Sequence, residues 1–386
     1  MYKVVLVDDE KWILESLKGA IDWRSLGFEI VGEASNGAEA LERIREIRPD
    51  VVFIDIRMPG MSGLELIGKI HEAQWPVQCI VASGYAEFEY AKQAMRYGVA
   101  GYCLKPFDSA EIREALTAAK TKIEREREAL HNELLVLLQD AKAASRDQWV
   151  RALGRCGFRW DEADGAFAVV VRGPAGCGLF TRWPFVALRL GSRKTAYLLN
   201  GRDRERVKET LAERFPPEAE GVGMSRTFHD IRQIGEHVED AIAASYRNFI
   251  AGAKEVGEPS PAPPHELDAE ALCIFEEGVR RNDAAYVRQA FDGIELRFRT
   301  GRYDIRHAFR LYNLLLSFAD RTGSGQDERY LLGFDDLAHS FPDVSAMLSS
   351  LQSLLSANVD DVCEAEGEKR GEETFRQIVA YVREHF

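Results

Sequence analysis

Short apolar runs alternate with amphipathic stretches along the first 120 residues of the chain. Val4–Val7, Val51–Ile54 and Cys79–Ala82 are apolar or nearly so throughout, which is typical of strands buried on both faces of a parallel sheet. Residues 28–34 and 101–104 predict two further strands. Helical spacing of apolar residues fills the intervals between the five strands. Five successive βα units of this length predict a doubly wound parallel sheet.

A long helix is predicted to follow, because the chain contains no Gly or Pro from Ser109 to Ala144. Four apolar residues recur at every seventh position of this helix: Leu116, Ile123, Leu130 and Leu137. Such spacing marks a seam that a partner helix can cover. The second position of the seven-residue repeat is poorly suited to a helix interface, because it holds Ala119, Glu126 and Glu133. We expect residues 109–145 to form a dimerising linker helix; the alternative is a solvated helix packed on its own chain.

The pattern changes beyond residue 148. Strands are predicted at 166–171, 185–190 and 195–199, with helices at 202–215 and 231–250, so residues 148–255 read as an α+β middle domain. Four prolines between Gly257 and His265 predict a stiff, extended linker at 256–265. Residues 266–358 are helical by period. A short amphipathic segment, 372–386, ends the chain.

Composition narrows the class of protein. A chain of 386 residues predicts more than one domain, because single cores rarely grow beyond ~250–300 residues. The chain has 50 Lys and Arg against 63 Asp and Glu, a net charge of −13, which disfavours non-specific binding to a phosphate backbone. No apolar stretch approaches the ~20 residues that cross a bilayer, and the N-terminus lacks a secretory signal. Six scattered cysteines suit reduced thiols in the cytoplasm.

Polar residues stand where four of the predicted strands end. Asp8 and Asp9 follow the first strand, Asp55 the third, Ser83 the fourth and Lys105 the fifth. Taken singly, each has a plain alternative as a helix cap, a turn residue or a solvated lysine. Ligands of open α/β sheets bind at the carboxyl ends of the strands, where all five residues would meet. We therefore expect one functional site there.

The chemistry of that site follows from its residue types. Three crowded carboxylates need a cation between them, and oxygen ligands suit Mg²⁺. Asp8 and Asp9 would hold the metal and Asp55 would share it. One oxygen of Asp55 could then attack a phosphoryl group to form an acyl phosphate. Mg²⁺ and the Lys105 ammonium would stabilise the transferring oxygens, and Ser83 could hydrogen-bond one of them afterwards.

With these residues, and with Lys105-Pro106 and the loop Met58–Gly63, residues 1–120 resemble a response-regulator receiver domain. The resemblance implies a flavodoxin-like fold with strand order 2-1-3-4-5 and a sensor histidine kinase as partner. It implies that Asp55 is the phosphoacceptor and that the backbone carbonyl of Arg57 joins Asp8, Asp9 and Asp55 as a Mg²⁺ ligand. Ser83 and Tyr102 match the switch residues, and Lys105 matches the family lysine, usually before a cis proline bond.

A narrower resemblance rests on three stretches, Asp22-Trp23, Leu26–Phe28 and Ser83–Phe88, which look like the receivers of YesN-type AraC-family regulators. That family order is receiver, linker helix, variable middle region and C-terminal AraC-type DNA-binding domain. Residues 372–386 resemble only the first helix of that last domain. We therefore expect a truncated chain, natural or engineered, that forms a homodimer and would bind DNA only through a domain it does not contain.

The middle region weakly resembles a degenerate GGDEF-like domain, on the stretch Gly221–Ser225 and a following helix with Ala241, Ala244 and Tyr246. A diguanylate cyclase needs an acidic hairpin to hold Mg²⁺. The turn Leu190–Lys194 has no acid, so no cyclase activity is expected. The Gly-rich loop at 172–178 lacks the ending of a phosphate-binding loop and reads as a plain turn.

Two other classes of function compete with the signalling switch. An enzyme of the haloacid-dehalogenase or phosphatase class also uses a strand-end Asp and Mg²⁺, but it usually carries Asp-x-Asp after the first strand, where this chain has Asp8-Asp9-Glu10. A regulatory protein with a ligand- or partner-binding middle region would use its receiver mainly to dimerise. We favour a non-enzymatic response regulator in which phosphorylation of Asp55 changes dimer geometry.

Overall fold

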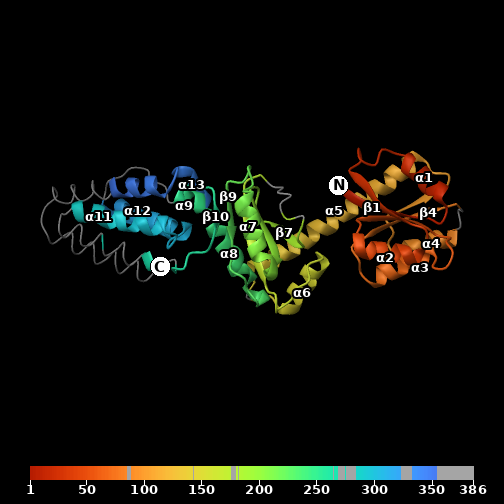
Figure 1. Ribbon diagram of the computed structural model, residues 1–386, viewed down its shortest axis with the longest axis horizontal. Helices are drawn as coiled ribbons and strands as arrows, with labels where there is room; N and C mark the ends of the chain where they lie inside the picture. The colour runs from red at the N-terminus through yellow and green to blue at the C-terminus, as the bar shows by residue number, and fades with distance from the viewer. Residues whose placement is uncertain are drawn as a thin grey trace. The chain divides into compact units, whose positions relative to one another are not determined.

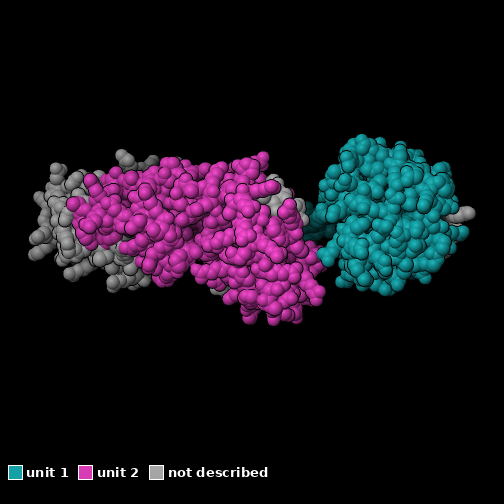
Figure 2. Space-filling model, viewed as in Figure 1, with its two compact units in different colours: residues 1–132 teal, residues 133–386 magenta. Residues whose placement is uncertain are grey.

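The computed structural model describes residues 1–84, 88–141, 143–174, 180, 182–263, 265–267, 274, 284–322 and 333–353. The chain divides into two compact units, Met1–Asn132 and Glu133–Phe386, which Figure 2 distinguishes by colour. Within the described ranges, no helix combines the length and apolarity needed to cross a bilayer. The predicted C-terminal segment 372–386 and residues 85–87 of the stretch Ser83–Phe88 lie outside these ranges.

The first unit contains a parallel five-stranded sheet in the order β2-β1-β3-β4-β5, which confirms the predicted doubly wound, flavodoxin-like fold. Its strands are β1 (Tyr2–Val7), β2 (Phe28–Ala34), β3 (Val51–Asp55), β4 (Gln78–Ser83) and β5 (Gly101–Leu104). A helix follows each strand, namely α1 (Lys11–Gly19), α2 (Gly37–Ile47), α3 (Gly63–Glu72), α4 (Phe88–Arg96) and α5 (Ser109–Gln139).

Helices cover both faces of this sheet (Figure 1). Successive side chains of a strand point to opposite faces. Val4 and Leu6 of β1 accordingly pack with residues of α1 and α5, whereas Val5 and Val7 pack with residues of α2 and α3. The near-complete burial of β1, β3 and β4 explains why their sequences are continuous apolar runs.

The structure corrects the interpretation of two seam residues in α5. Leu116 and Ile123 are only 1% and 5% exposed, because they pack into the core of the first unit together with Ile112 and Ala119. The prediction that these two residues form a dimer seam is therefore wrong. Leu130 and Leu137 are half-buried, and their role in a dimer stays a prediction. Seven-residue spacing indicates that one face of a helix is covered, but it does not distinguish a partner helix from the chain's own core.

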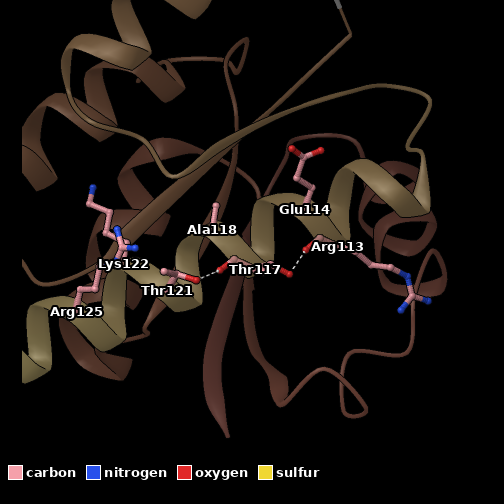
Figure 3. Close-up of a pocket in the computed structure, with 7 residues that line it drawn as sticks. All are labelled: Arg113, Glu114, Thr117, Ala118, Thr121, Lys122 and Arg125. Carbon is pink, nitrogen blue, oxygen red and sulfur yellow. Dashed lines mark hydrogen bonds between the residues drawn. The ribbon is translucent and has the colours of Figure 1, made fainter.

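The opposite face of the same part of α5 is polar, as Figure 3 shows. It includes Arg113, Thr117, Thr121 and Arg125, which line a surface hollow of about 640 Å³. Thr117 Oγ1 donates to the carbonyl of Arg113 at 2.7 Å, and Thr121 Oγ1 donates to that of Thr117 at 2.9 Å. These bonds satisfy the hydroxyl groups within the helix itself. The helix is thus amphipathic, with its apolar stripe against its own sheet.

The second unit contains a mixed five-stranded sheet in the order β10-β9-β6-β8-β7. β6 is antiparallel to β8 and β9, β7 is antiparallel to β8, and β10 is parallel to β9. The strands are β6 (Ala166–Arg172), β7 (Phe185–Arg189), β8 (Lys194–Asn200), β9 (Gly221–Met224) and β10 (Val256–Gly257). The first three coincide with predicted strands, whereas β9 and β10 were not predicted as strands.

The described part of the second unit also contains several helices. Beside the sheet these are α6 (Arg146–Arg155), α7 (Arg204–Glu213), α8 (Ile234–Ala244) and α9 (Arg247–Ala251), with short 3₁₀ turns at Gly201–Asp203 and Ile231–Gln233. Later in the chain come α11 (Ala284–Arg299), α12 (Ile305–Thr322), α13 (Phe334–Ser340) and a helical stretch at 344–353. The helical prediction for 266–358 agrees with these described parts.

The described residues of the predicted linker, 256–263 and 265, differ from the stiff linker expected there. Their first two residues form β10 at the edge of the sheet. Glu258 accepts hydrogen bonds from Arg204 and Lys208 at 2.8 and 3.0 Å, and Ala262 is 7% exposed within a core that also contains Tyr246 and Phe298. The segment therefore packs inside one unit instead of separating two domains. Prolines favour extended backbone, and extended backbone suits an edge strand as well as a linker.

Asp304, which directly precedes α12, should make the second unit sensitive to acid. Although burial raises its pKa, hydrogen bonds from His307 and Arg306 bring the pKa of Asp304 down to about 2 from 3.8. A carboxyl whose pKa is lowered on folding stabilises the protein above its unfolded pKa, and this contribution is lost as pH falls through the folded value.

We expect Asp304→Asn to reduce stability by roughly 2 kcal/mol near pH 6, with the deficit shrinking as pH falls from about 4 to about 2. Thermal unfolding followed by circular dichroism at several pH values would measure the difference between the two proteins. A deficit that stays constant over this pH range would contradict the role given to Asp304.

Candidate functional site

The predicted site residues do meet at one edge of the first sheet. Asp55 ends β3 and Ser83 ends β4, while Asp8 follows β1 and Lys105 follows β5. Asp8, Asp55 and Ser83 are 3%, 6% and 4% exposed, which is unusual burial for polar side chains. Parallel strands bring their carboxyl ends together, and so the topology alone assembles residues that lie 97 positions apart in the chain.

Lys105 bridges the two buried carboxylates. Its Nζ donates to Asp8 Oδ2 at 2.6 Å and to Asp55 Oδ1 at 2.7 Å. Burial raises the pKa of Asp55, and the nearby Lys105 ammonium only partly opposes this rise. Burial lowers the pKa of Lys105, but the bonds to Asp55 and Asp8 outweigh it and the pKa is raised. The lysine is therefore held in its charged form between two groups that would otherwise repel each other.

The second oxygen of Asp55 is also held in place. The backbone N–H of Arg57 donates to Asp55 Oδ2 at 2.9 Å. Gly63, the first residue of α3, approaches this strand end so closely that a Cβ there would lie 2.0 Å from the carbonyl oxygen of Asp55. Ser62 caps α3 through a reciprocal pair of bonds with Glu65. A fixed helix start thus supports the end of β3.

Two contacts at this site were missed by sequence reasoning. The Arg57 N–H bond to Asp55 is a backbone interaction, which no side-chain motif reports. The close approach of Gly63 could have been suspected from its place in the matched loop, since glycine often marks a close backbone approach. The family resemblance implies a role for Arg57 only as a metal ligand through its carbonyl.

The remaining predicted residues have the following places in the structure. Asp9 is exposed beside Asp8. The backbone N–H of Glu10 donates to Asp8 Oδ1 at 3.1 Å, which orients that carboxylate. Tyr102 is half-buried and packs against the core on the α2 and α3 face. The Lys105–Pro106 peptide bond is cis, as the family resemblance implies.

The donor atoms fit a hard divalent cation. Asp8 and Asp55 lie close together, because one oxygen of each contacts the same Lys105 Nζ, and Asp9 is the next residue after Asp8. Oxygen-only ligands of this kind suit Mg²⁺. Among the residues that the structure describes, no three His, Cys, Asp or Glu side chains are grouped as a metal site. At this edge of the sheet, Lys105 is the side chain that contacts both Asp8 and Asp55.

Comparison with known proteins agrees with this geometry. The family model of the response regulator receiver domain matches residues 4–117. This part of the chain is a response regulator receiver domain. The matched stretch includes Asp8, Asp55, Ser83 and Lys105, so the receiver assignment covers all the residues that meet at the sheet edge.

Two curated relatives of the receiver, from different organisms, are named as transcriptional regulatory proteins. The uncharacterized transcriptional regulatory protein YesN of Bacillus subtilis is 48% identical over 126 residues, which are 33% of this chain and 34% of YesN. The transcriptional regulatory protein HptR of Staphylococcus aureus is 40% identical over 112 residues, 29% of this chain and 44% of HptR. The chain therefore matches less than half the length of either relative.

Solved receiver structures are also similar. The receiver domain of AraT, a response regulator from Geobacillus stearothermophilus, is 42% identical and aligns over 33% of this chain and 98% of that one, with a TM-score of 0.31. The family match ends at residue 117 and does not support the GGDEF-like resemblance of the middle region.

Proposed function

We propose that this chain is a phosphorylation-dependent response regulator whose Asp55 accepts a phosphoryl group from a sensor histidine kinase. The observation that carries the proposal is the arrangement around Asp55. A buried carboxylate at the carboxyl end of a strand has one oxygen against a lysine ammonium and the other against a backbone N–H. This arrangement orients a nucleophile and compensates its charge at the same time.

In the proposed reaction, an Asp55 carboxylate oxygen attacks the phosphorus atom of the donor. The new bond joins that oxygen to phosphorus, and the bond from phosphorus to the donor breaks, so the leaving group keeps the electron pair. The product is an acyl phosphate on Asp55. Lys105, held protonated beside Asp55, stabilises the charge on the transferring oxygens. The hydroxyl of Ser83 then donates a hydrogen bond to a phosphoryl oxygen. Tyr102 is the aromatic switch residue that responds to this change.

Asp8, Asp9, Asp55 and the backbone carbonyl of Arg57 are the residues that would hold Mg²⁺. When bound, this ion supplies further neutralisation of the phosphoryl oxygens. The chemistry is self-catalysed by the receiver on its own aspartate, so the proposed activity is that of a signalling module. We propose no cyclase activity for the middle region, because the turn at 190–194 has no acidic residue.

The proposed output is transcription through an AraC-type DNA-binding domain. The names of the receiver's relatives support a transcriptional output. The AraC type rests on the sequence stretches around Asp22 and Ser83. A homodimer would use the part of α5 that contains Leu130 and Leu137, since Leu116 and Ile123 belong to the receiver core. The degenerate GGDEF-like character of the middle region rests on its sequence alone.

The test of this function is phosphorylation by a small donor. Wild-type protein incubated with acetyl phosphate and Mg²⁺ should gain the mass of one phosphoryl group, which alkali removes, because acyl phosphates hydrolyse readily in base. Asp55→Asn should gain none. Asp22→Asn, which alters an exposed carboxylate of the same domain, is the matched control and should label like wild type. Intact-mass measurement would refute the assignment if wild type stayed unmodified or Asp55→Asn was still labelled.

A further inference from the structure

Three polar contacts join α5 to the edge of the receiver sheet where the strands begin. The hydroxyl of Tyr2 donates to Glu124 Oε1 at 3.0 Å. Arg127 Nη2 donates to Asp50 Oδ1 at 2.5 Å, and Gln78 Nε2 donates to Glu126 Oε2 at 3.0 Å. We call these three pairs the clamp. Ala119 and Ile123 hold the preceding turn of α5 against the receiver core by apolar contacts. The clamp holds the next turn of the helix by polar contacts.

Asp50 is the centre of the clamp. Its Oδ2 accepts the backbone N–H of Lys3 at 2.7 Å while its Oδ1 holds Arg127. Its own N–H donates to the carbonyl of Lys3, and its carbonyl accepts from the N–H of Gln78, both at 2.9 Å. The Arg127 guanidinium also lies 5.4 Å from the centre of the Tyr2 ring, within cation–π range. Asp50 therefore ties the helix to β1 and β4 as well as to β3.

Each clamp residue on the sheet side lies at the start of a strand whose other end leads to a residue of the phosphorylation site. Tyr2 begins β1, which leads to Asp8. Asp50 directly precedes β3, which ends at Asp55, and Gln78 begins β4, which ends at Ser83. All residues of β3 and β4 are buried. Because a close-packed interior transmits small displacements, a shift at one edge of these strands reaches the other.

We propose that the clamp is the device by which the receiver controls α5. The clamp keeps residues 124–127 bound to the start of β1, β3 and β4. Negative charge added at Asp55 changes the electrostatic attraction between Lys105 and the carboxylates of Asp8 and Asp55. The resulting displacement of β1, β3 and β4 is transmitted to α5. The claim that the clamp holds residues 124–127 rests on the described contacts alone. The relay from Asp55 rests on the proposed function.

Hydrogen exchange in the full chain tests the clamp. The double variant Tyr2→Phe with Asp50→Asn removes the phenol bond and the charge pair while keeping the size of both side chains. Exchange of the amides of residues 124–132 should then be about fivefold faster than in wild type, because surface polar contacts each contribute modestly to local stability. Glu29→Gln, which weakens the exposed Arg24–Glu29 pair on β2, should leave these amides unchanged.

Slow exchange of the β3 amides in the double variant would show that the receiver is still folded. Given that, unchanged exchange at residues 124–132 would overturn the clamp. The same measurement after acetyl phosphate tests the relay: exchange at 124–132 should change at least twofold in wild type and not in the double variant. If Asp55 is labelled and wild type shows no change there, the relay is wrong. If Asp55 is not labelled, the proposed function and the relay fail together, while the unmodified proteins still decide the clamp.

Discussion

Replacing Lys105 with glutamine is expected to slow the phosphorylation of Asp55 by acetyl phosphate on the order of a hundredfold, the usual effect of removing one donor that stabilises transition-state charge. Lys105 contacts Asp8 and Asp55 at 2.6 and 2.7 Å, and no neutral side chain can offset both carboxylates. The rate would be followed by intact mass at several time points, with saturating Mg²⁺.

The pH dependence of the same variant provides a second readout. Burial already raises the pKa of Asp55, and Lys105 opposes that rise. Without the lysine the pKa of Asp55 should rise further, so that the carboxylate is protonated at higher pH. The rate of the Lys105→Gln variant should therefore begin to fall at a higher pH than that of wild type as the solution is acidified.

Lys18→Gln is the matched control, because Lys18 pairs with Glu15 and Glu33 away from the phosphorylation site. It should label at the wild-type rate. A rate for Lys105→Gln within about threefold of wild type, far less than donor removal costs, would show that this ammonium does not assist the transfer.

Leu116→Ala is expected to destabilise the receiver by about 3 kcal/mol, whereas the same change at Leu130 should cost less than about 1 kcal/mol. Both leucines belong to the seven-residue series in α5, but Leu116 is 1% exposed in the receiver core and Leu130 is half-buried. Deleting a leucine side chain in a core leaves a cavity that the surroundings fill only in part.

The free energies would come from native-state hydrogen exchange of the β3 amides, which report the global opening of the receiver. This readout separates the receiver from the second unit, which need not unfold together with it. Equal effects of the two substitutions would contradict the division of α5 into a receiver-bound part and a later part.

The sequence predicts the doubly wound parallel sheet because the signals for its strands and helices are local. Buried parallel strands such as Val51–Asp55 are apolar in succession, and a strand that ends in Asp or Lys places that residue at a known edge. The positions of Asp8, Asp55, Ser83 and Lys105 followed from those two facts. Their residue types alone indicate phosphoryl chemistry.

Tertiary structure alone decided which surface each pattern faces. The spacing of Leu116 and Ile123 is the same for a partner helix and for the chain's own sheet, and only packing shows that the sheet covers them. The prolines of 256–265 likewise predict extended backbone, but not that Glu258 and Ala262 join the second unit.

The polar contacts of the receiver show the same limit. Lys105 meets Asp8 and Asp55 across 97 and 50 residues of sequence, and Arg127 meets Asp50 across 77. Such pairs produce no repeating pattern in the sequence, since each depends on the direction of a single side chain. The sequence by itself therefore determined the sheet and the residues at its carboxyl edge. Only the fold decided how Lys105 bridges that edge and how α5 is held at the other, because both depend on contacts between distant segments.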